Sequence, residues 1–109
     1  MPPEDELVAP FLLLAETTSV LTEHAYRQVI PASQARCLIE SAVRLPVRLL
    51  DNGSLYPRAF DIARALGWAK AYDALYVATA EHEGAELLTV DRRMRDAARR
   101  LGIRASLVR

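Results

Sequence analysis

The chain has 109 residues, of which 51% are hydrophobic, and its 14 acidic and 14 basic side chains give a net charge of zero. This composition predicts one soluble globular domain, residues 1–109, with no overall electrostatic attraction for nucleic acid. No apolar run approaches the ~20 residues that span a bilayer, the acidic N-terminus does not resemble a signal peptide, and Cys37 is the only cysteine. We therefore expect a cytoplasmic protein without membrane segments or intramolecular disulfides.

Helices and short strands alternate along the chain. We predict, in order, strand 7–9, helix 11–29, helix 32–44, strand 47–50, helix 55–66, helix 71–83, strand 86–90, helix 92–101 and strand 105–108. Pro31 separates the first two helices, and Cys37 lies in an apolar helical pattern that predicts a buried thiol. Ser54 stands where a helix N-cap is expected, and Gly67 and Gly84 stand just past helix ends.

This alternation predicts an α/β fold with a mainly parallel sheet. Parallel sheets place their functional sites at the C-terminal ends of the strands. Asp91 directly follows the apolar run of residues 87–90, Glu16 lies in the second turn of the helix after the first strand, and Asp73 opens the helix over residues 71–83. We expect these three acids to lie on the same side of the sheet.

Glu16 and Asp73 stand among apolar neighbours, where an ionised carboxylate is costly unless it is paired or bound to a metal. Oxygen ligands select hard cations such as Mg²⁺ or Mn²⁺, and with two histidines and one cysteine a structural zinc site is not expected. The alternative for each acid is a helix cap or a partly exposed ion pair with an arginine. The residues alone leave both interpretations open.

The C-terminal segment is basic although the whole chain is neutral. Residues 91–109 contain two aspartates and seven arginines, namely Arg92, Arg93, Arg95, Arg99, Arg100, Arg104 and Arg109. Clustered arginines can bind phosphates. The alternative is an arginine-rich helix face that only contacts solvent.

Two parts of the chain carry specific motifs, namely YDALYVATAE from Tyr72 with GAELLTVDRR from Gly84, and APFLLLAE ending at Glu16. These motifs resemble the PIN-domain nuclease family of the VapC toxin type. The sequence YDALYVATAE from Tyr72, followed by GAELLTVDRR from Gly84, is similar to the C-terminal half of a PIN domain, in which a strand ends in T-x-D before a helix. The sequence APFLLLAE, which ends at Glu16, resembles the segment that carries the family's glutamate. The resemblance covers essentially the whole chain and is most specific over residues 66–101. It implies a three-layer α/β/α fold.

The resemblance implies that Glu16, Asp73 and Asp91 are catalytic carboxylates that bind Mg²⁺ or Mn²⁺, with Thr89 and Ser19 in supporting positions. Family members are ribonucleases, and many are toxins held inactive by a small antitoxin. The implied reaction is hydrolysis of an RNA phosphodiester by metal-activated water. Arginines at the positions of Arg92 and Arg93 could hold the RNA backbone.

The sequence departs from the family pattern at two places. Ser19 stands where the family usually has asparagine, and the chain starts at what resembles the family's second strand, so the first strand and its catalytic aspartate are not found. Asp5 follows no apolar strand and is not expected to replace that aspartate. An apolar sheet face exposed by the missing strand predicts a homo-oligomer.

Two other functions are compatible with these features. One is a catalytically inactive, truncated PIN-like module that binds an antitoxin, RNA or itself. The other is a small flavodoxin-like regulatory domain, which is disfavoured because neither a glycine loop for phosphate nor an acidic pair after a first strand is visible.

Overall fold

The computed structural model describes residues 6–108, so Asp5 lies outside the described residues. The chain divides into two compact units, with the boundary between Leu50 and Asp51. We call them unit 1 (residues 1–50) and unit 2 (residues 51–109) and describe each by itself. Within residues 6–108, no helix combines the length and the apolar composition that crossing a membrane requires.

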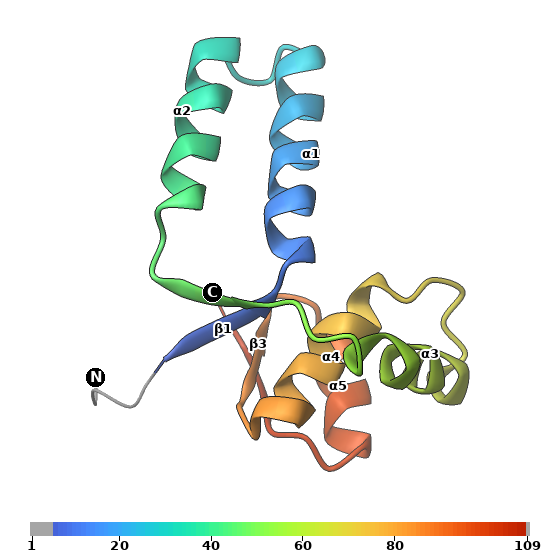
Figure 1. Cartoon of the computed structure of the whole chain (residues 1–109). Helices are drawn as coiled ribbons and strands as arrows, with labels where there is room; N and C mark the ends of the chain where they lie inside the picture. The colour runs from blue at the N-terminus through green and yellow to red at the C-terminus, as the bar shows by residue number, and fades with distance from the viewer. Residues whose placement is uncertain (1–5, 109) are drawn as a thin grey trace. The chain divides into compact units, whose positions relative to one another are not determined.

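Unit 1 is a two-stranded parallel sheet whose strands are joined by a pair of helices. Its elements are β1 (Leu7–Pro10), α1 (Leu12–Tyr26), α2 (Ala32–Val43) and β2 (Val47–Leu50). The register pairs Leu7 with Val47 and Pro10 with Leu50. The two helices lie side by side as a hairpin, drawn in blue and green in Figure 1.

The turn between α1 and α2 begins earlier than the sequence pattern predicts. Gln28 has a φ of 60°, a left-handed conformation that ends the helix, so α1 stops at Tyr26 rather than at residue 29. Pro31, with an extended backbone, precedes the first turn of α2.

The prediction that Cys37 is buried is wrong. Cys37 is exposed, whereas Ala35, two residues earlier, is the buried residue of α2. Residues two apart point about 200° apart on a helix, so only one of the two can face α1. The side chains of α2 that do not face α1 remain accessible because unit 1 has few elements to cover them.

Unit 2 contains three helices and a second parallel strand pair. Its elements are α3 (Leu55–Leu66), α4 (Tyr72–Glu83), β3 (Leu87–Thr89), α5 (Arg92–Arg100) and β4 (Ala105–Leu107). The register pairs Leu87 with Ala105 and Thr89 with Leu107. A two-stranded sheet is marginally stable alone, so packing of the helices must contribute most of the stability.

The core of unit 2 is built mainly from small and aliphatic side chains. Its buried hydrophobic residues are Leu55, Ala59, Ile62, Ala63, Ala74, Val77, Ala78, Ala80, Leu87, Met94, Ala97, Ala98, Ile103 and Ala105. The one buried polar residue among the described residues, Thr79, donates its hydroxyl to the carbonyl of Leu75 at 2.7 Å. Alanine allows helices to approach closely, and the core therefore depends on tight backbone packing rather than on large side chains.

The helix ends of unit 2 are set by glycine as predicted, but not by serine. Gly67 and Gly84 adopt φ values of 70° and 61°, which a residue with a Cβ rarely adopts. Ser54 makes no side-chain cap to α3. Its hydroxyl and its amide instead donate to Asn52 Oδ1 at 2.9 and 3.0 Å, because the asparagine forms a local turn that competes for these groups.

The predicted α/β class with parallel strands is confirmed. Five helices alternate with four strands within residues 6–108, and both strand pairs are parallel. The four strands form two sheets of two strands each. The single-domain boundary at residues 1–109 remains a prediction.

Candidate metal and nucleic-acid site

Asp91 connects β3 to α5 and is the N-cap of that helix. Its Oδ1 accepts hydrogen bonds from the backbone amides of Arg93 at 2.8 Å and Met94 at 3.3 Å. These amides lack partners within the helix, so the carboxylate satisfies them and also favours the positive end of the helix dipole. Asp91 is therefore a helix cap, which is one of the two interpretations that the sequence left open.

Thr89 supports the same corner from the end of β3. Its hydroxyl accepts a hydrogen bond from the Asp91 amide at 3.1 Å and lies 3.6 Å from the sulfur of Met94. Met94 is buried in the core. The backbone of Asp91 is thus held by a contact from the preceding strand, and its carboxylate is held by two amides of the following helix, which orients the second carboxylate oxygen.

Asp73 lies in the first turn of α4 and comes close to Asp91 through a shared arginine. Nη2 of Arg93 lies 3.5 Å from Asp73 Oδ2 and 3.9 Å from Asp91 Oδ2. The two carboxylates are partly exposed, with side-chain exposures of 46% and 43%. Unit 2 therefore directs two of the three predicted acids at one positive charge.

Trp68, in the loop between α3 and α4, completes this cluster. The guanidinium carbon of Arg93 lies 5.2 Å from the centroid of the indole ring, within the range of a cation–π contact. The indole is half-buried. The Arg93 side chain thus has a carboxylate from α4, a carboxylate from the start of α5 and an aromatic face around it.

Glu16 and Ser19, the other predicted site residues, lie on α1 in unit 1. Glu16 is half-buried and Ser19 is exposed. Among residues 6–108, no three histidine, cysteine, aspartate or glutamate side chains form a ready metal-binding group. That Glu16 joins the two aspartates at a metal site remains a prediction.

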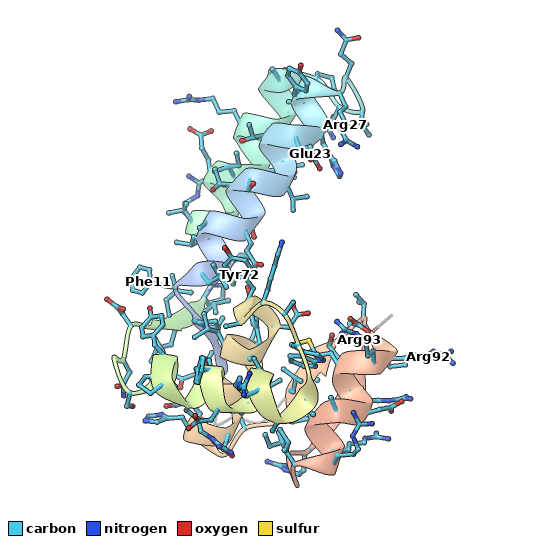
Figure 2. All side chains as sticks on the ribbon, turned by 90° about the vertical axis from the view of Figure 1, so that its right-hand side faces the viewer. Phe11, Glu23, Arg27, Tyr72, Arg92 and Arg93 are labelled. Carbon is cyan, nitrogen blue, oxygen red and sulfur yellow. The ribbon has the colours of Figure 1, made fainter. Side chains whose placement is uncertain are left out.

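The arginines of the C-terminal segment divide into two groups. Arg99 and Arg104 donate to the carbonyls of Ala105 and Gly84 at 3.0 and 3.2 Å, so they hold the backbone of unit 2. Arg92, in contrast, is exposed at the beginning of α5 next to Arg93, as Figure 2 shows. Only part of the basic segment is therefore free to contact a ligand.

The arrangement in unit 2 suits a hard cation. Asp73 and Asp91 each have an Oδ2 within 4 Å of the same charged nitrogen, Nη2 of Arg93, which is a monovalent cation. Both donors are carboxylate oxygens, which Mg²⁺ and Mn²⁺ prefer. Mg²⁺ retains several waters, so it does not need a complete cage of protein ligands.

The model of the PIN domain family matches residues 2–100. The chain belongs to the PIN domain family. PIN domains are nucleases that typically use divalent metal ions, and the segments that carry Glu16, Asp73 and Asp91 all lie within the matched range. No curated protein matches the chain.

Two features of this PIN domain were not recognised from the sequence. The contact between Arg93 and Trp68 was not predicted, and Arg93 was expected only to contact RNA. The spacing between them gives no signal, because the loop of residues 67–71 and the start of α5 come together only through packing. Ser19, three residues after Glu16, stands at the position where the family usually has asparagine.

Proposed function

We propose that this PIN domain is a Mg²⁺- or Mn²⁺-dependent endoribonuclease of the VapC toxin type. The observation that carries the proposal is the position of Asp73 and Asp91, which match the family motif and have one oxygen each within 4 Å of a single cationic nitrogen. When a divalent ion is bound, it supplies water activation and neutralises charge on the scissile phosphate. Glu16 is the third proposed ligand.

The protein residues have distinct roles in this proposal. Asp73 and Asp91 hold the ion, and the hydroxyl of Thr89 with the amides of α5 fix the orientation of Asp91. Oxygen Oδ1 of Asp91 already accepts two amides, so Oδ2 is the oxygen that faces the ion. Because α5 begins at this corner, its N-terminal dipole also favours an anionic phosphate here.

Binding of the RNA backbone is assigned to the exposed arginines of α5. Arg92 lies one residue from the carboxylate cluster, and Arg100 lies at the other end of the helix; both are exposed. Arginine pairs well with phosphate but gives no sequence information by such contacts alone. We therefore expect backbone affinity from α5 and base selection from other residues.

A toxin of this type needs an antitoxin, and unit 1 supports such a partner. Unit 1 exposes eight of the fourteen large apolar side chains that are exposed among the described residues, including Val29, Val43 and Leu45, at 65%, 63% and 56% exposure. An apolar groove in this unit is lined by Leu13, Leu14, Thr17, Ala42, Val43, Leu45, Val47 and Leu49. Exposed apolar surfaces of this kind mark binding sites for proteins.

The same apolar surface favours the second candidate function, a PIN-like module that binds partners or itself without cleaving RNA. A homo-oligomer is expected under either function. Size-exclusion chromatography with light scattering tests it, and a monomer at all concentrations would contradict it.

Cleavage of a fluorogenic single-stranded RNA, with a DNA oligonucleotide of the same sequence in parallel, distinguishes the two functions. We expect metal-dependent cleavage of RNA that EDTA abolishes. Glu16→Gln should abolish it, whereas Glu23→Gln on the same helix should not, because Glu23 only pairs with Arg27 at 3.5 Å on the surface (Figure 2). Equal activity of both variants would remove Glu16 from the site.

A further inference from the structure

We propose that, in the absence of metal, the guanidinium of Arg93 occupies the space beside the carboxylates of Asp73 and Asp91. It leaves this space when a divalent ion binds. The inference rests on the proposed function, because it assumes that Asp73 and Asp91 hold the ion. Its basis is the position of one nitrogen, Nη2 of Arg93, within 4 Å of both carboxylates. A guanidinium and a metal ion cannot both occupy this space, so the two cations compete.

The Arg93 contacts are weak enough to be exchanged. At 3.5 and 3.9 Å they are longer than charge-assisted hydrogen bonds, which fall at about 2.7–2.9 Å. The Arg93 side chain is 61% exposed, and exposed ion pairs of this kind contribute little to stability. Breaking them therefore opposes metal binding only modestly, and the arginine reduces metal affinity without preventing binding.

A second ion pair in unit 2 has the shorter hydrogen bonds expected of a pair that stabilises the fold. Arg58 donates to Glu81 through two nitrogens, at 2.7 and 2.8 Å. These hydrogen bonds hold the pKa of Glu81 below its usual value and raise the pKa of Arg58. This bidentate pair connects α3 to α4, whereas Arg93 adopts no such geometry with either aspartate.

Trp68 provides the arginine with a partner that does not compete with the metal. The guanidinium carbon lies 5.2 Å from the indole centroid while Nη2 faces the aspartates. A planar guanidinium that rotates away from the carboxylates keeps its contact with the ring but changes its position over it. Since Trp68 is the only tryptophan in the chain, its fluorescence reports on this movement without a label.

Metal binding to the full chain tests the competition directly. Binding of Mn²⁺, followed by the electron paramagnetic resonance signal of the free ion, is compared for wild type, Arg93→Gln and the matched control Arg92→Gln. We expect Arg93→Gln to tighten Mn²⁺ binding about tenfold, because a positive charge beside the ion is removed. Arg92→Gln, which removes the same charge from the neighbouring exposed position, should change it less than about twofold. Equal effects of the two substitutions would overturn the inference.

Trp68 emission during a Mg²⁺ titration adds a measurement whose decisive result comes from the wild-type protein. Emission should change with the same midpoint as metal binding in wild type and stay constant in Arg93→Gln. Constant emission in metal-bound wild type would overturn the inference even if Arg93→Gln did not fold. If wild type binds no Mn²⁺, or if Asp73→Asn binds it equally, the proposed metal site itself fails. If Asp73→Asn abolishes binding but the two arginine variants agree, only the role of Arg93 fails.

Discussion

Substitutions of Asp91 should separate its role as a helix cap from its role as a proposed metal ligand. The cap depends on an oxygen acceptor, since Oδ1 accepts the amides of Arg93 and Met94 at 2.8 and 3.3 Å. Asparagine retains that oxygen and is as good an N-cap as aspartate, whereas alanine removes it at a cost of about 1–2 kcal/mol. Both substitutions remove the negative charge that a divalent ion needs.

For a domain of this size, about 1 kcal/mol corresponds to a shift of about 4–8 °C in the melting temperature. We therefore expect Asp91→Ala to lower the Tm by about 5–10 °C. Asp91→Asn should lower it by less than half as much, because the capping oxygen is kept and only the interactions of the charge with the helix dipole and with exposed Arg93 are lost. RNA cleavage should fall by about a hundredfold or more in both variants.

Thermal denaturation followed by circular dichroism, with cleavage assayed well below the transition, measures both effects. If Asp91→Asn is as unstable as Asp91→Ala, the cap does not depend on the oxygen that the structure assigns to it. If Asp91→Asn is stable and cleaves RNA at the wild-type rate, Asp91 is a cap and nothing more.

Three further predictions concern stability and accessibility. Glu81→Gln should destabilise the protein at neutral pH and have no effect in acid. The hydrogen bond with Arg58 lowers the pKa of Glu81 in the folded state, so the ionised carboxylate stabilises the fold above the pKa of the unfolded state. That stabilisation is lost as the pH falls through the pKa of the folded state. Urea unfolding at pH 7 and pH 3 measures it, and an equal loss at both would contradict it. Gly67→Ala should lower the free energy of unfolding by about 1 kcal/mol, because φ at Gly67 is 70°. Gly53→Ala should lower it less, because Gly53 has no positive φ and an added Cβ would meet open space. Melting temperatures measure both, and a lower Tm for Gly53→Ala than for Gly67→Ala would contradict this. Cys37 should react fully with a thiol reagent in the native state, since it is exposed, and protection until denaturation would contradict this.

Much of the secondary structure could be predicted because its signals are local. Strand Val47–Leu50 and helix Leu55–Leu66 have the predicted boundaries, since proline and glycine mark their ends. The end of α1 could not be predicted, because the left-handed turn at Gln28 has no glycine signal. Exposure of Cys37 was also missed, because periodicity gives the spacing of a helix face but not what covers it.

The candidate site was predictable where family motifs fix the position of an acid. Asp73 in the first turn of α4 and Asp91 at the start of α5 follow from the sequence. The arginine between them could not be found in this way, because its contacts with Asp73 and Trp68 join residues 20 and more positions apart. Such contacts depend on how α4, α5 and their loops pack, which no local pattern records.

The most direct test of the central claim is metal-dependent RNA cleavage by Asp73→Asn compared with Asp96→Asn. Asp96 is an exposed carboxylate on α5 that pairs with Arg95 at 2.9 Å, so its substitution removes the same charge without touching the proposed site. We expect Asp73→Asn to lose at least about a hundredfold in the cleavage rate at saturating Mg²⁺, and Asp96→Asn to stay within about twofold of wild type. Cleavage by folded Asp73→Asn at the rate of the control would contradict the assignment of a metal-dependent nuclease site to this cluster.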